Sequence, residues 1–289
     1  MATYGYIHAN VSGTDKPMTP SGDYLPFPSE KVDLVARSFR DGGTDFKHGM
    51  SVEQDQYGKL YYLCACAHRQ TNRTSDAGGV ALHAELRELK KEEFLDGALD
   101  RLLRFPFADE VDIVCGRVPS KSTPFAPVQD VRLESQLLKQ VICAIIYGSL
   151  GRLLSRREAP VYVALPEEGF DELVRRVLKA VYKVMPYALR ARSGYITFPN
   201  SATLPDGVTL CFIPMGWMQR FPDEPILTPL SPESCASAID RILRSEHGRG
   251  LRELAKYLVK ATPEQRLAFY GSIVSGKLSM HFAVRVVAW

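Results

Sequence analysis

The chain has 289 residues, 45% of them hydrophobic and 24% charged, a composition that excludes a disordered or fibrous protein. Its 36 basic and 33 acidic residues leave a formal charge of +3, so the molecule as a whole is not a polyanion binder. Six cysteines, at positions 64, 66, 115, 143, 211 and 235, are too sparse for a disulfide scaffold and indicate a reducing compartment.

The sequence predicts a cytoplasmic protein that does not bind membranes. Its first residues, MATYGYIHAN, lack the charged region and apolar stretch of a signal peptide. The most apolar helical segment, VICAIIYGSLG at 141–151, is much shorter than the roughly 20 residues that cross a bilayer.

The first half of the chain is predicted to be rich in strands. Alternating apolar and polar residues predict strands at 4–11 and 78–86, and a hairpin of 46–54 and 60–68. The proline-rich segment 12–28 predicts an irregular loop. Three further elements are expected: a helix starting at Ser29, a helix at 90–105 and a strand at 109–117.

The second half predicts alternating helices and strands. A helix at 129–155 is followed by a wholly apolar strand at 159–165, which we expect to be covered on both faces. The next helix is amphipathic, with Phe170, Leu173, Val174, Val177, Leu178, Val181 and Val184 facing inward. Its cations Arg175, Arg176, Lys179 and Lys183 are expected to face water. Strands at 193–199 and 207–214 precede a helical tail, with helix starts at Ser231 and Thr262.

This order of elements predicts an α/β protein with a mixed sheet flanked by helices and a helical C-terminal part. The proline-punctuated loop at 120–127 is the expected linker between two subdomains, residues 1–125 and 126–289. A single continuous sheet is the alternative.

The segment YYLCACAHRQ places Tyr62, Cys64, Cys66 and His68 at alternate positions, which share one face of a strand. A metal site could use Cys64, Cys66, His68 and His83, or take His48 from a neighbouring strand. A nucleophile and its base, Cys66 and His68, are another interpretation. Both faces of the strand are apolar or small, however, so we interpret these groups as buried filler and expect no metal.

No nucleotide or cofactor motif is present, since neither GxxxxGK[ST] nor GxGxxG occurs in the chain. Two sets of residues are candidates for binding a partner. The first set is basic and consists of Arg175, Arg176, Lys179, Lys183, Arg190 and Arg192. The second set, Met215, Trp217 and Phe221 with Met218, could form an exposed docking knob or could cover the core.

The segment 145–199 resembles the middle region of the bacterial GTPase-associated protein family. The matching residues are Pro186, Leu189, Arg190, Ser193, Thr197 and Phe198, and more faintly Gly78, Gly79 and His83. The succession of elements is also similar to the core of DENN modules, which are built on longin-like α/β layers. The resemblance implies a longin- or DENN-like two-subdomain arrangement. It also implies a non-enzymatic adaptor encoded with GTPases or ATPases in bacterial conflict or phage-defence systems.

Three functional hypotheses follow. We favour an interaction protein that docks a GTPase or other nucleotide-binding partner and has no catalytic residue or cofactor. The alternative is a hydrolase or transferase that uses His68 with Cys66, or a zinc ion held by Cys64, Cys66 and His83. A nucleic-acid-binding module that uses the basic surface 175–192 is the third hypothesis.

Overall fold

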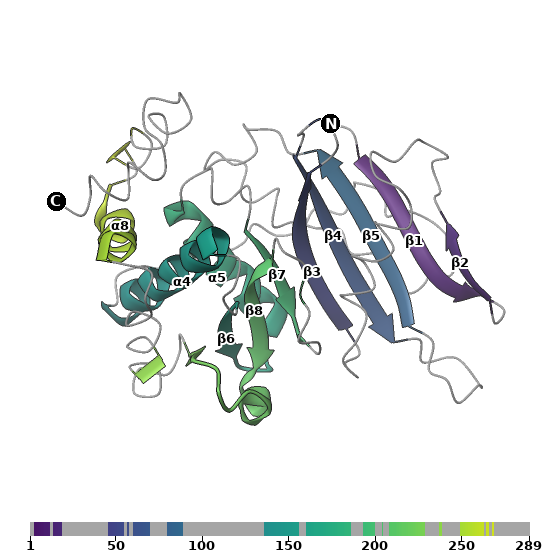
Figure 1. Ribbon diagram of the computed structural model, residues 1–289. Coiled ribbons are helices and arrows are strands. Elements are labelled where there is room, and N and C mark those ends of the chain that lie inside the picture. The colour runs from purple at the N-terminus through teal and green to yellow at the C-terminus, as the bar shows by residue number, and fades with distance from the viewer. Residues whose placement is uncertain are drawn as a thin grey trace. The chain divides into compact units, whose positions relative to one another are not determined.

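The computed structural model divides the described residues into two compact units (Figure 1). The backbone is described for residues 3–11, 14–18, 46–54, 57, 60–69, 80–88, 136–155, 160–185, 193–199, 204, 208–228, 237–238, 249–262, 264–265 and 268. Side chains are described at 48–51, 57, 139–149, 160–185, 193–199, 204, 208–228, 237–238, 253, 256–262, 264–265 and 268. The predicted helices at Ser29 and 90–105, the strand at 109–117 and the helix start at Ser231 lie outside these residues.

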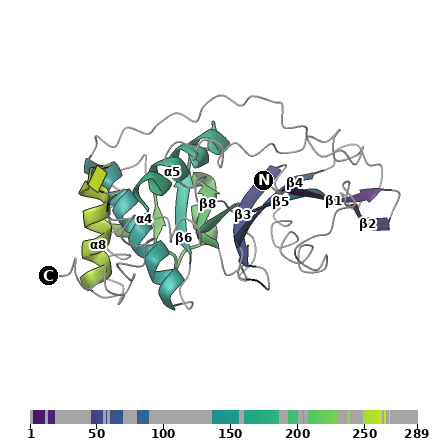
Figure 2. The ribbon, with the colours of Figure 1, turned by 90° about the horizontal axis from the view of Figure 1, so that it is seen from above.

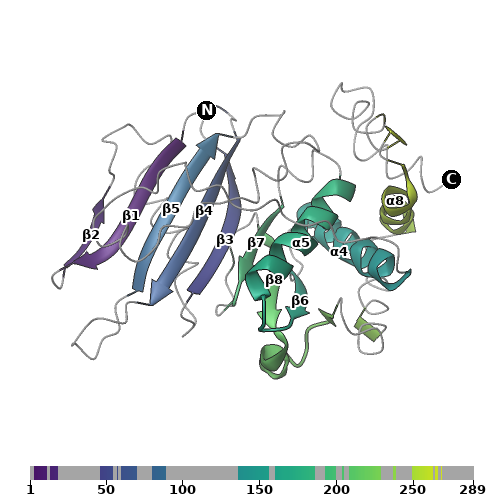
Figure 3. The ribbon, with the colours of Figure 1, turned by 180° about the vertical axis from the view of Figure 1, so that it is seen from behind.

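The first unit contains strands that pair in an antiparallel manner, in the order β2-β1-β5-β4-β3-β7 (Figure 3). Their bounds are β1 Thr3–Val11, β2 Thr14–Met18, β3 Phe46–Gln54, β4 Leu60–Arg69, β5 Val80–Glu88 and β7 Gly194–Thr197. The predicted hairpin is confirmed as β3 and β4, and the predicted strands at 4–11, 78–86 and 193–199 are confirmed as β1, β5 and β7.

Strand β2 corrects the prediction that residues 12–28 are irregular throughout. Thr14–Met18 pairs with the end of β1, with Val11 opposite Thr14 and His8 opposite Pro17. Pro17 lowers the strand propensity of this segment, but β2 is an edge strand, where a missing N–H donor is tolerated. Pairing with β2 also satisfies backbone groups of β1 that would otherwise lack a strand partner.

The second unit combines parallel strands with helices (Figure 2). Its elements are α4 Gln136–Ser155, β6 Val161–Leu165, α5 Phe170–Val184, β8 Val208–Pro214, the 3-10 helix η3 Met215–Arg220, β9 Ile226–Leu227 and α8 Arg249–Lys260. Strand β6 lies between β8 and β9 and is parallel to both. Helices α4 and α5 contact each other and β6, and α8 packs on α4. The predicted α/β class, with helices beside strands of both pairing types, is confirmed.

The core of the second unit is built from β6, β8 and α4. Every residue of β6 and of β8 is buried, which confirms the prediction that the apolar strand is covered on both faces. All the described α4 residues from Val141 to Ser149 are buried as well, so this part of the helix is enclosed around its whole circumference. Among the described residues, no helix combines the length and apolar character needed to cross a membrane.

The predicted helix start at Thr262 has the expected capping box. The Thr262 backbone N–H donates to Gln265 Oε1 at 2.8 Å, and the Gln265 N–H donates to Thr262 Oγ1 at 3.2 Å. This reciprocal pair satisfies two backbone donors that a helix start leaves without an intrahelical acceptor.

Replacing Thr262 with Ala should lower the free energy of unfolding by about 1 kcal/mol, because the cap oxygen is lost. Urea denaturation followed by circular dichroism measures the change. Thr262→Ser is the matched control, because serine keeps a hydroxyl oxygen that can accept from the Gln265 N–H. Equal losses in the two variants would show that the capping pair does not stabilise the helix.

Candidate functional site

The carboxyl ends of β6 and β8 meet at one edge of the parallel strands, because Leu165 and Pro214 are register partners. Ligands of open α/β sheets are bound outside this edge, where loops leave the strands. The loop 166–169 follows β6, and η3 begins directly after β8. We therefore take this edge as the candidate site of the second unit.

The two segments at this edge lie against each other. A Cβ atom built on Gly216 would stand 3.2 Å from Glu167 Oε1, closer than side-chain atoms usually approach. Glycine at 216 thus lets the Glu167 carboxylate rest beside the η3 backbone without displacement. Gly169, with φ of 67°, ends the loop in the left-handed region that glycine adopts at low cost.

No residue of the 3-10 helix is fully buried. We call Met215, Trp217, Arg220 and Phe221 the η3 surface. Met215 is 40% exposed, and Trp217 is half-buried. The Arg220 guanidinium lies 3.8 Å from the centre of the Trp217 ring. Residues three apart eclipse each other on a 3-10 helix, so this stacking follows from the local geometry.

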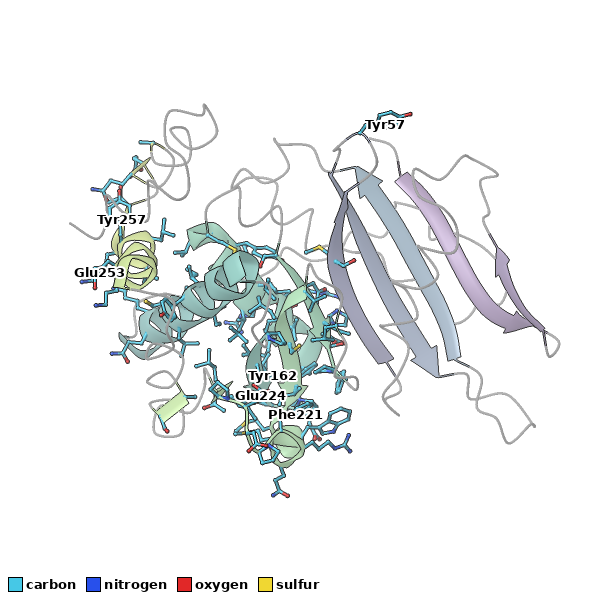
Figure 4. All side chains as sticks on the ribbon, viewed as in Figure 1. Tyr57, Tyr162, Phe221, Glu224, Glu253 and Tyr257 are labelled. Carbon is cyan, nitrogen blue, oxygen red and sulfur yellow. The ribbon has the colours of Figure 1, made fainter. Side chains whose placement is uncertain are left out.

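Phe221 fixes the end of η3 to the core (Figure 4). Its ring centre lies 5.0 Å from that of Tyr162, a buried residue of β6. Its backbone N–H donates to the Met218 carbonyl at 3.1 Å. Each of the two interpretations of the predicted knob therefore holds for a different residue. Phe221 covers the core, and Met215 is exposed to solvent.

Exposed charged residues lie on the same two segments. Glu167 and Glu168 are exposed in the loop after β6, and Arg220 and Asp223 are exposed on and after η3. An apolar centre with a charged rim is the usual anatomy of a protein interface. Among residues whose side chains are described, no three potential metal ligands come together.

The predicted basic set does not form the solvated helix face that the sequence suggests. All but one of the seven residues predicted to face inward on α5 are buried, and the other, Leu173, is half-buried. Lys179, predicted to face water, is only 7% exposed, and the other three cations, Arg175, Arg176 and Lys183, are half-buried. The expectation is wrong for Lys179 because neighbouring elements cover α5 on more than its apolar side. Arg190 and Arg192 lie outside the described residues.

Ser193 and Thr209 connect a buried hydrogen-bonded group in the second unit. Tyr182 on α5 donates through its hydroxyl to the Ser193 carbonyl at 2.7 Å, and the Ser193 and Thr209 hydroxyls bond to each other. All three residues are buried. Ser193 therefore has a structural role here, because it ties α5 to the start of β8 and satisfies polar groups inside the core.

A second hydrogen-bonded group lies in the first unit, around His48 on β3. His48 is fully buried, and its Nδ1 lies 3.0 Å from the Tyr195 hydroxyl on β7. The Thr197 hydroxyl accepts from the His48 N–H at 2.9 Å and donates to the His48 carbonyl at 3.0 Å. These bonds fix the β3 backbone and the imidazole ring. The sequence did not predict that Tyr195 would be a partner of His48, because its pattern indicated only that Tyr195 belongs to a strand.

The register of β3, β4 and β5 places the predicted Cys/His set relative to its neighbours. Cys66 is opposite His48 on β3 and opposite His83 on β5. Cys64 is opposite Glu85, while His68 is opposite Phe46 and Ala81. The backbone thus brings Cys66 and His83 together in register and places His68 outside this row.

Comparison with models of protein families and with curated proteins finds no match for this chain.

Replacing Gly169 with Ala should lower the free energy of unfolding by about 1 kcal/mol, because a Cβ atom disfavours the left-handed backbone. Asn tolerates this conformation better, so Gly169→Asn should cost less. Chemical denaturation ranks the two variants, with Glu168→Ala as an exposed control in the same loop. A neutral Ala variant would contradict the positive φ at this position.

Proposed function

We propose that this chain is a non-enzymatic adaptor of the cytoplasm that docks a protein partner through the η3 surface. The observation that supports this most directly is the exposed Met215 beside the stacked Trp217 and Arg220, at the carboxyl edge of the buried strands. Trp and Arg are the residue types most enriched among the energetic centres of protein interfaces. Two features anchor this surface to the core: η3 follows β8 directly, and Phe221 packs on Tyr162 of β6.

The chemistry of the η3 surface favours a protein over a nucleic acid. Charges of both signs are exposed on η3 and the segments beside it, with Arg220 on η3 and the carboxylates Glu167 and Asp223 in the loops after β6 and η3. A nucleic-acid interface would instead concentrate cations against phosphates. The covered Lys179 also weakens the alternative based on the α5 cations.

The partner class that we propose is a nucleotide-binding protein of the GTPase or ATPase type. This part of the proposal rests on the resemblance of residues 145–199 to the GTPase-associated family, which also suggests a role in bacterial conflict or phage defence. The cytoplasmic placement is supported by Cys143 and Cys211, which are buried as thiols rather than joined in disulfides.

Affinity capture from a lysate of the native host tests the proposal, with the captured proteins identified by mass spectrometry. We expect the full chain to recover a protein that binds GTP or ATP. For the purified pair, Trp217→Ala should weaken binding by about 30-fold or more, as expected for loss of an interface centre worth about 2 kcal/mol. Calorimetric titration gives the dissociation constants.

Tyr57→Ala provides the matched aromatic control, because Tyr57 is 85% exposed and belongs to the first unit. This variant should bind the partner as tightly as the parent chain. Circular dichroism of both variants separates a lost contact from a lost fold. Failure to recover a nucleotide-binding protein would contradict the partner class, and undiminished binding by Trp217→Ala would contradict the docking surface.

A further inference from the structure

The methionines whose side chains are described differ in their exposure to solvent. Met215, the first residue of η3, is 40% exposed, whereas Met50 on β3 is 2% exposed and Met185, at the end of α5, is 0% exposed. Met218, also on η3, is half-buried. Of these methionines, Met215 is therefore the most accessible to small molecules in water.

The position of Met215 in the fold accounts for its exposure. Pro214, the last residue of β8, is buried, and η3 begins directly after it. The other end of η3 is anchored by Phe221, whose ring centre lies 5.0 Å from that of the buried Tyr162. Because both ends of η3 are joined to buried residues, the exposure of Met215 is a property of the folded second unit.

We propose that Met215 is a reversible oxidation site, at which hydrogen peroxide converts the η3 surface from an apolar to a polar state. The thioether sulfur attacks one peroxide oxygen, so that an S–O bond forms while the O–O bond breaks. The hydroxide that is released takes the proton of the transferred hydroxyl and leaves as water. The sulfur is oxidised by two electrons, the peroxide is reduced by two, and the product is methionine sulfoxide.

The exposure of Met215 also permits the reverse reaction. Methionine sulfoxide reductases return the sulfoxide to the thioether. In this step the S–O bond breaks, the oxygen leaves as water, and two thiols supply the two electrons by forming a disulfide. Such an enzyme must reach the modified side chain. Met215 is exposed in the folded chain, whereas a sulfoxide at Met50 or Met185 would be accessible only after unfolding.

The effect of oxidation on docking rests on the proposed function, while the oxidation itself does not. Methionine is favoured in interface cores because its flexible apolar side chain fills irregular gaps. The sulfoxide oxygen is a hydrogen-bond acceptor that loses its water when a partner covers it, which costs free energy unless the partner supplies a donor. Oxidation of Met215 is therefore expected to weaken docking through the η3 surface.

The first test follows each methionine of the full, reduced chain in dilute hydrogen peroxide. Peptide mapping by mass spectrometry should show sulfoxide forming at Met215 about 10-fold faster or more than at Met50 and Met185, with Met218 between them. In concentrated urea these rates should become similar, because unfolding exposes every methionine. Oxidation of folded Met215 as slowly as Met50 and Met185 would overturn the proposal.

Reversibility is measured by treating the oxidised chain with methionine sulfoxide reductases A and B and dithiothreitol. We expect Met215 sulfoxide to return to methionine without unfolding of the chain. Dithiothreitol alone should leave the sulfoxide in place while it reduces disulfides and sulfenic acids at the cysteines, so it separates cysteine from methionine oxidation. Failure of the reductases to restore Met215 would contradict a reversible site.

Calorimetric titration with the purified partner measures the effect on docking. After peroxide and then dithiothreitol, the chain should bind about 10-fold more weakly or worse, and the reductases should restore its affinity. Met215→Leu is compared with its own untreated form, and peroxide should change its dissociation constant by less than about 2-fold because leucine has no thioether. Met218→Leu should lose affinity on oxidation as the parent chain does.

Unchanged binding by the oxidised parent chain, or an equal loss in Met215→Leu, would contradict the effect on docking. If affinity capture recovers no partner, the proposed function fails, and the order of oxidation rates still decides whether Met215 is the oxidation site. Retention on a hydrophobic-interaction column then tests the change of the surface. It should fall on oxidation of the parent chain but not of Met215→Leu, and equal retention before and after oxidation of the parent would contradict the polar state.

Discussion

Burial of the parallel strands is the constraint on which the second unit depends. Strand β6 lies between two parallel partners, and neither it nor β8 has a residue exposed to solvent. Strands covered on both faces leave only their ends for contact with other molecules. Three buried polar residues of the unit, Tyr182, Ser193 and Thr209, are linked by hydrogen bonds. The docking surface that we propose lies at the carboxyl edge of these strands, where the loop 166–169 and η3 begin.

The strands could be predicted from the sequence because their patterns are local. Alternation identifies β1, β3, β4 and β5, and a continuous apolar run identifies β6. Strand β2 could not be predicted in this way, since Pro17 argues against a strand and only pairing with β1 explains it. The prediction that Lys179 faces water was wrong for a related reason. Helical periodicity locates the apolar side of α5, but it carries no information about what covers the other side.

The candidate docking residues were predictable as a group but not as individuals. Large apolar side chains near prolines identify 215–221, and nothing in that pattern distinguishes an anchor from an exposed contact. The distinction comes from Tyr162, which is more than fifty positions earlier in the chain and receives the Phe221 ring. The stacking of Arg220 on Trp217 depends on a 3-10 turn rather than an α-helix. Glu167 and Gly216 meet only because β6 and β8 end together.

Strand β4 shows that cross-strand register carries information that spacing along one strand does not. Cys64, Cys66 and His68 look equivalent in the sequence because all three occupy alternate positions of β4. Their cross-strand partners differ: Cys66 has a histidine on each side, whereas His68 has Phe46 and Ala81. A slip of one residue in either pairing would move these partners to opposite faces. The register therefore distinguishes positions of β4 that look alike in the alternation along this one strand.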